Sequence, residues 1–540
     1  MPRPRFHAGT LARLLLTACA LLAAAASGQQ HAPAHGGVTG NGLLDEPIEL
    51  VPEALGPYHW PVSTDHEEAQ RFFDQGMQLR WAYNVDEAAR SMMRARTIDP
   101  DCAMCWWGEA FALGSYLNAG MSTEKAARAR TAILRAASLL DRASPVEQAL
   151  IRATTVRYPA GYDPEARRPV DQAFADAMAE VHAAWPDHHE VATVYAVALF
   201  LLEERRGYRD LTDPDLQKLH AVLRGVIDDH PSHPGACHLY IHATESTQLP
   251  ELGLPCAETL GRAVPVASHI QHMPSHTWNE LGLWGRSVEA NQAARASDLA
   301  AREGRGFSYV PTHNLHMLLF AASFDGQGEI ALQAGRDYRE LSGDSTFEVL
   351  TLVRFGRFEA LRALEAEADT PLEGALLDFG HGYAALRTGD AAEARGRLER
   401  LQVYVSETED RFRFHAASTL VGSLAELLSG ALLRADGDLE GAIAAFERAV
   451  ALEDSLDYDE PEPLPFAPRH WLGAALLEAG RGAAAERVYR TELADHPHNG
   501  WSLHGLVQAL ALQGRSDAAA ERDLAASWAR ADVELSASRF

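Results

Sequence analysis

The chain has 540 residues, of which 47% are hydrophobic and 23% charged, and 75 acidic side chains outweigh 48 basic ones to give a net charge of −27. This apolar fraction is ordinary for a folded protein and excludes wholesale disorder. The acidic balance predicts that the protein binds neither nucleic acid nor an anionic membrane surface, because like charges repel. Alanine and leucine dominate the sequence, which favours helices.

Residues 1–28 have the pattern of a secretory signal peptide. Basic residues near the start precede a short apolar stretch, Leu14–Ala26, which is too short to cross a bilayer as a helix. We therefore predict a periplasmic or secreted protein. The alternative is a lipoprotein, because Leu16-Thr17-Ala18-Cys19 resembles a lipidation motif and would be anchored at Cys19. No later stretch is long and apolar enough to predict a membrane span.

The rest of the chain is predicted to form a leader and three blocks of helical repeats. Residues 29–60, rich in glycine, histidine and proline, are expected to be a flexible leader. Helical repeats are predicted for residues 61–228, 229–345 and 346–540. The last block contains an acidic, proline-rich loop at 453–468, where a helix cannot continue. We interpret this loop as an insertion between repeats; the alternative is that it covers one face of the array.

Four cysteines remain after the predicted signal peptide. Cys102 and Cys105 have the spacing of a redox motif or half of a zinc site, but no second pair with that spacing follows. An exported protein can form disulfides. The sequence does not decide whether Cys102 and Cys105, or Cys237 and Cys256, are bonded.

Small and large residues recur at fixed offsets in three places. They are Phe72, Gly76, Leu79, Ala88, Met92, Ala95 and Pro100; Gly430, Leu433, Ala442, Phe446 and Ala449; and Leu472, Gly473, Leu476, Ala485, Tyr489 and Pro497. These offsets resemble the tetratricopeptide repeat, a helix–turn–helix unit of about 34 residues. The resemblance implies an all-α solenoid of antiparallel helix hairpins stacked into a superhelix, with a groove for a protein or peptide partner.

A shorter signature marks the predicted hairpins. Glycine is followed five residues later by alanine at six places: Gly285/Ala290, Gly326/Ala331, Gly389/Ala394, Gly437/Ala442, Gly480/Ala485 and Gly514/Ala519. Glycine can end the first helix in a left-handed conformation, and a small alanine lets the second helix approach closely.

Histidines gather in the central repeats, where nine of the 24 lie between His230 and His316. Three pairs are three or four residues apart, a spacing that places both rings on one face of a helix. Glu245 follows His242 on the same face. The candidate metal ligands are His238, His242, His272, His276, His313, His316 and Glu245, with His269 as a candidate outer member.

Three such pairs on neighbouring helices predict a transition-metal site. Imidazole suits copper and zinc, and a mixed histidine and glutamate set also suits iron. Six histidines in three pairs resemble, in number and spacing, the dinuclear copper sites of oxygen-handling proteins, so a dinuclear site that activates oxygen or water is one hypothesis. No catalytic residue is assigned. The alternative function is a scaffold for protein–protein interaction in the cell envelope, in which the histidines only pack.

Overall fold

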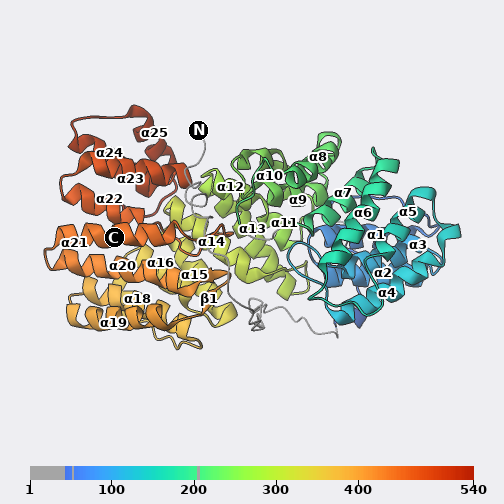
Figure 1. The fold of residues 1–540 in the computed structure, drawn as a ribbon, viewed down its shortest axis with the longest axis horizontal. Coiled ribbons are helices and arrows are strands. Elements are labelled where there is room, and N and C mark those ends of the chain that lie inside the picture. Colours follow the sequence, from blue (N-terminus) through green and yellow to red (C-terminus); the bar gives the residue numbers. More distant parts are fainter. Residues whose placement is uncertain (1–42, 52–53, 204–206) are drawn as a thin grey trace, which may run out of the picture. The chain divides into compact units, whose positions relative to one another are not determined.

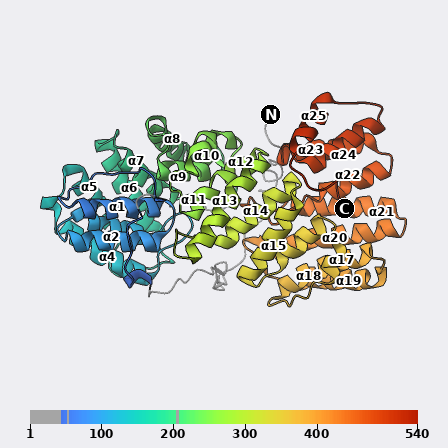
Figure 2. The ribbon, with the colours of Figure 1, turned by 180° about the vertical axis from the view of Figure 1, so that it is seen from behind.

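The computed structural model describes residues 43–51, 54–203 and 207–540 (Figures 1 and 2). Within these ranges the regular structure is helical apart from one short antiparallel pair, β1 (Arg411–Phe412) and β2 (His415–Ala416). Backbone contacts divide the chain into two units. The N-terminal unit comprises the described residues up to Ala322 together with Asp457–Glu462, and the C-terminal unit comprises Ser323–Leu456 and Pro463–Phe540.

Most consecutive helices of the N-terminal unit pack against each other as antiparallel neighbours (Figure 2). Its helices are α1 (Glu67–Trp81), α2 (Val85–Ile98), α3 (Ala103–Leu113), α4 (Thr123–Ala137), α5 (Pro145–Thr155), α6 (Arg168–Ala184), α7 (His189–Phe200), α8 (Pro214–Asp229), α9 (Pro234–Thr244), α10 (Leu254–Leu260), α11 (Ser268–His272), α12 (Pro274–Glu280) and α13 (Trp284–Arg302). Short 3₁₀ helices are η1 (Leu43–Asp45), η3 (Leu140–Arg142) and η4 (Pro250–Gly253). The boundary between the units falls within α14 (Pro311–Asp325).

The C-terminal unit repeats the same hairpin arrangement (Figure 1). Its helices are α15 (Gly328–Ser342), α16 (Thr346–Arg354), α17 (Phe358–Arg362), α18 (Pro371–Arg387), α19 (Ala391–Glu407), α20 (Ala417–Ala435), α21 (Leu439–Glu453), α22 (Arg469–Glu478), α23 (Gly482–Asp495), α24 (Gly500–Leu512) and α25 (Ala518–Ser527).

The hairpin of α20 and α21 shows why the sequence folds this way. Gly437 ends the first helix with φ of 87°, a left-handed conformation that costs glycine little. The Asp438 side chain then accepts a hydrogen bond from the backbone N–H of Gly441 and caps α21. Across the hairpin, a Cβ added to Gly430 would lie 2.4 Å from the ring of Phe446, so only glycine allows this approach.

The predicted tetratricopeptide-like, all-α architecture is confirmed by these hairpins. Of the six glycines in the short signature, five have positive φ: Gly326, Gly389, Gly437, Gly480 and Gly514. The sixth, Gly285, lies inside α13, and the left-handed turn before that helix is made by Gly282 with φ of 69°. At this hairpin the glycine that makes the turn therefore lies three residues before the glycine predicted from the signature.

Some predictions concern residues outside the described ranges. The signal peptide at 1–28, the lipidation site at Cys19 and residues 29–42 of the leader belong to this group. In the described part of the leader, Leu55 and Trp60 are buried in the core of the N-terminal unit. Among the described residues, none of the helices has the length and apolar character needed to cross a membrane.

Both cysteine pairs left open by the sequence are disulfide-bonded. Cys102 is bonded to Cys105 at the start of α3, and Cys237 of α9 is bonded to Cys256 of α10. The second disulfide joins α9, which carries two of the candidate ligands, to a neighbouring helix.

Candidate metal centre

Four helices of the N-terminal unit carry the clustered histidines. His238 and His242 lie on α9, His269 and His272 on α11, His276 on α12, and His313 and His316 on α14. Pro274 is the first residue of α12, a position where its missing N–H costs nothing. Met273 alone separates α11 from α12, so the two short helices present three histidines to the same interior. All seven rings are buried except that of His313, which is half-buried.

Three of the rings form the first triad, which consists of His238, His242 and His269. One nitrogen from each lies within 4.8 Å of the others, and all three side chains are buried. The Nε2 atoms of His238 and His269 are 3.1 Å apart. That separation is close to the distance between two nitrogens bound to one ion at about 2.0–2.1 Å each.

The second triad consists of His272, His276 and His313. Their ligand atoms also lie within 4.8 Å of one another. The ring centroid of His272 lies 4.9 Å from that of His276 and 4.8 Å from that of His313. The two triads are adjacent, because His272 Nε2 lies 3.1 Å from His269 Nδ1.

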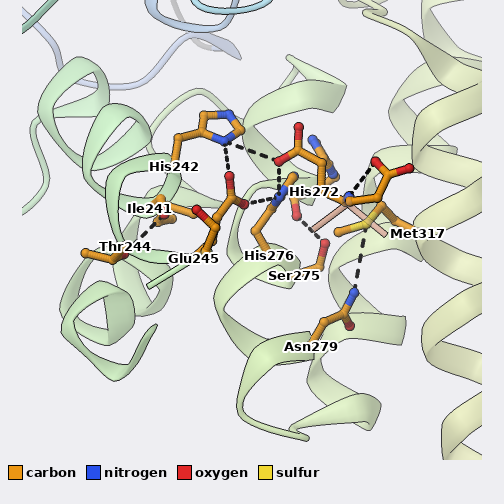
Figure 3. A network of polar contacts seen from close by, with 12 residues as sticks. Ile241, His242, Thr244, Glu245, His272, Ser275, His276, Asn279 and Met317 are labelled. Atoms are coloured by element: carbon orange, nitrogen blue, oxygen red, sulfur yellow. Dashed lines mark hydrogen bonds and ion pairs between the residues drawn. The ribbon is translucent and has the colours of Figure 1, made fainter. Parts of the chain in front are cut away.

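Two buried glutamates lie beside both triads. Glu245, which caps the C-terminus of α9, has Oε1 2.8 Å from His242 Nδ1 and Oε2 2.6 Å from His276 Nδ1, so that its carboxylate lies between the two rings (Figure 3). Glu460, from the segment Asp457–Glu462, has Oε2 3.4 Å from His276 Nδ1 and 3.7 Å from His242 Nδ1. The four side chains form a third group whose ligand atoms converge.

Burial and the carboxylates set the protonation of the cluster. Burial lowers the pKa values of His238, His269 and His272 well below the usual range, and neighbouring histidines lower them further, so these rings are neutral. Burial also opposes charge on His276, but the Glu245 and Glu460 carboxylates outweigh it and raise the pKa of His276 to about 9. Burial, and then repulsion from Glu460, raise the pKa of Glu245 to about 7.

A directed chain of hydrogen bonds runs through the neutral rings. The backbone carbonyl of Trp81 can only accept, so His238 Nδ1, 2.6 Å away, donates to it and His238 Nε2 is an acceptor. His269 Nε2 must then donate to His238, and His272 Nε2 to His269 Nδ1. The chain leaves His272 Nδ1 as a buried acceptor that has no hydrogen-bond donor among the described residues.

His276 Nε2 is also buried and has no hydrogen-bond partner within the described ranges. With a pKa of about 9 this ring is protonated at neutral pH, so Nε2 would have to lose its proton to an incoming ion before binding it. A buried polar atom without a partner costs about 1–3 kcal/mol. A metal ion bound to these nitrogens would remove that cost. The chemistry of the donors therefore fits a metal ion.

Tyrosines cover the first triad. The ring centroid of Tyr83 is 4.2 Å from that of His238 and 5.2 Å from that of His269, and Tyr309 lies 4.8 Å from His269. Tyr83 has φ of 62°, a left-handed conformation that costs a non-glycine residue about 1–2 kcal/mol. The turn that holds Tyr83 in this conformation directly follows Trp81, whose carbonyl orients His238.

The structure brings together most, but not all, of the predicted ligands. Five of the six predicted histidines lie in the two triads, with Glu245 beside them. His316 is in neither triad, and His269 completes the first triad in its place. The three-residue spacing of His269 and His272 was the signal for this. Glu460 was not predicted, because nothing near it in the sequence connects the acidic loop to the histidines.

Neither a protein-family model nor a curated protein matches the sequence. Among solved structures, the APC/C hetero-tetramer Cut9–Hcn1 is 14% identical with a TM-score of 0.29, over 85% of this chain and 76% of the other. The human IFIT1 dimer with m7Gppp-AAAA is 12% identical with a TM-score of 0.31, over 87% and 91%. The P58(IPK) TPR domain is 13% identical with a TM-score of 0.21, over 83% and 98%.

These TM-scores are too low for any argument about function or partner. The repeat architecture is established by the helix hairpins of the chain itself.

Proposed function

We propose that this protein binds two transition-metal ions, one in each histidine triad, with the tetratricopeptide-like repeats as the scaffold that holds them. The observation that supports the proposal most directly is the convergence of six imidazoles into two adjacent sets of three, five of them buried and one half-buried. Six polar rings in an apolar interior require partners, and two ions would supply partners to all of them.

The donors favour copper or zinc. Neutral imidazole is a good ligand for both ions, and for nitrogen donors the usual order of affinities places copper highest. Iron becomes a candidate if Glu245 or Glu460 also binds. Three protein ligands leave a fourth position of each ion open, the arrangement that catalytic metal sites use to activate bound water or oxygen. Each ion would then have a position for an exogenous ligand.

Hydrogen bonds made by the ring nitrogens that would not bind an ion also support the proposal. Ligand histidines generally donate their other N–H to a carbonyl or carboxylate, which fixes the tautomer and orients the ring. His238 donates to the Trp81 carbonyl, while His242 and His276 bind Glu245 through Nδ1. In each case Nε2 is the nitrogen left for an ion.

Metal analysis of the full chain, purified without a histidine tag, tests the proposal. We expect two equivalents of copper or zinc by mass spectrometry, one equivalent in each of His238→Gln and His313→Gln, and two in the control His220→Gln. His220 is buried on α8 of the same unit and binds the Ala243 carbonyl rather than the triads. Folded protein that binds no metal after incubation with either ion would contradict the proposal and favour the scaffold alternative.

A further inference from the structure

We propose that Glu245 is a positioning residue shared by both triads, whose single carboxylate fixes the tautomer of one ligand in each. This proposal rests on the two-ion centre proposed above. In this proposal Glu245 forms hydrogen bonds to two ligand histidines and does not itself bind an ion.

The contacts divide the two carboxylate oxygens between the triads. Oε1 lies 2.8 Å from Nδ1 of His242, a member of the first triad, and Oε2 lies 2.6 Å from Nδ1 of His276, a member of the second. A carboxylate oxygen accepts, so each ring carries a proton on Nδ1 and uses Nε2 toward the ion. Figure 3 shows Glu245 between His242 and His276.

The surroundings of Glu245 give it few other roles. Its side chain is completely buried at the C-terminal end of α9. Among the described residues, no lysine or arginine lies within ion-pair distance of it, and its ion pairs are those to the two rings. Its other charged neighbour is the carboxyl group of Glu460, with which it shares a hydrogen bond. A buried carboxylate needs partners such as the two rings, because an unpaired one would be costly.

A glutamine at this position has a specific consequence. An amide has the same shape as a carboxylate but offers one accepting oxygen and one donating nitrogen. In Glu245→Gln, the oxygen can accept from one ring, but the nitrogen can only donate and cannot hold the Nδ1 proton of the other. Glu460 Oε2 lies 3.4 Å from His276 Nδ1 and can still accept there, so His242 is the ring that loses its acceptor. The proton of His242 then moves to Nε2, the atom that faces the ion. One triad therefore loses a ligand while the other keeps all three.

Metal titration of the metal-free full chain tests this consequence. We expect two tight binding steps for the wild-type protein, and for Glu245→Gln one tight step and one weakened 10- to 100-fold, the usual effect of losing such a partner. The control is Glu190→Gln, because Glu190 is also fully buried and also contacts a histidine at 3.1 Å, but that histidine, His233, belongs to neither triad. The control should keep two tight steps. Two tight steps in Glu245→Gln would overturn the inference.

Two further measurements show whether a negative result comes from misfolding, from a wrong metal proposal or from a wrong role for Glu245. Circular dichroism verifies that each variant is folded. Nitrogen-15 NMR of the metal-free protein reports the ring protons directly: Nδ1 of both His242 and His276 should carry a proton in the wild type, and only one of the two in Glu245→Gln. Unchanged Nδ1 protonation in the variant would refute the inference whatever the metal content, whereas a wild-type protein that binds no metal would refute only the two-ion centre.

Discussion

His269 and His316 are the two positions at which the ligand set predicted from helical spacing differs from the rings that tertiary packing brings together. On α14, His313 belongs to the second triad, but three residues advance a helix by about 4.5 Å, so His316 reaches a different level. His269 lies one turn before His272 on α11, where its two ring nitrogens contact both His238 and His272. Helical spacing predicted helices whose histidines the structure brings together, and tertiary packing determines which of those rings converge.

These two histidines give a paired prediction. We expect His269→Gln to bind one equivalent of metal instead of two, because the first triad loses a ligand. His316→Gln should still bind two equivalents, since His316 lies in neither triad. Metal content by mass spectrometry after dialysis checks both variants. A loss of metal in His316→Gln with none in His269→Gln would favour the ligand set predicted from sequence.

At the scale of helices, the stacking of the C-terminal repeats depends on glycines that face an aromatic ring. Tyr489 on α23 is completely buried between α22 and α24. A Cβ on Gly473 of α22 would lie 2.3 Å from Tyr489 Cζ, and one on Gly505 of α24 would lie 2.1 Å from the same atom. The ring thus contacts the backbones of both neighbouring helices.

We predict that Gly505→Ala destabilises this unit by about 1–3 kcal/mol, because the added methyl group overlaps the ring. Gly473→Ala should have a similar effect. The matched control is Gly396→Ala on α19, where a Cβ meets nothing within 4 Å and alanine should stabilise the helix by up to about 1 kcal/mol. Thermal unfolding by circular dichroism measures all three. Equal melting temperatures for Gly505→Ala and the control would contradict the packing argument.

A buried polar network gives the C-terminal unit a dependence on pH. His470 on α22 has Nδ1 3.1 Å from Arg354 Nη1 and Nε2 3.1 Å from Ser502 Oγ. Burial, and then Arg354, lower the pKa of His470 to about 3, although Glu492 opposes the shift. An unfolded histidine takes up a proton below about pH 6.5, while the folded one does so only near 3. The folded state is therefore favoured above pH 6.5 and loses stability as the pH falls toward 3.

We predict that His470→Gln removes part of this acid sensitivity, because glutamine does not titrate. Between pH 6 and 4 the stability of the wild type should fall more steeply than that of the variant, by about 1.4 kcal/mol per pH unit. Hydrogen exchange of peptides from α22 and α23, measured by mass spectrometry, gives the opening free energy at each pH. The control His498→Gln changes a half-exposed histidine of the same unit and should keep the wild-type slope. Parallel slopes for wild type and His470→Gln would contradict the prediction.

At the scale of the whole molecule, the parts that sequence predicts are those encoded by neighbouring residues. The hairpins follow from offsets such as those of Gly430, Ala442 and Phe446, which meet within one helix–turn–helix unit. Pairs such as His238 and His242 likewise share a face of one helix. The contact between Glu460 and His276 cannot be predicted in this way, since it depends on tertiary packing of residues far apart in the chain.

Because it includes the segment Asp457–Glu462, the N-terminal unit is built from two separate stretches of the sequence. A polypeptide that stops at Ala322 contains all six triad histidines and Glu245 but lacks Glu460, one of the two glutamates beside them. Dissecting the protein at the apparent end of its N-terminal helices would remove one acidic side chain that contacts the cluster. If that half were expressed alone, its histidine cluster would therefore carry one carboxylate fewer than the cluster in the intact chain.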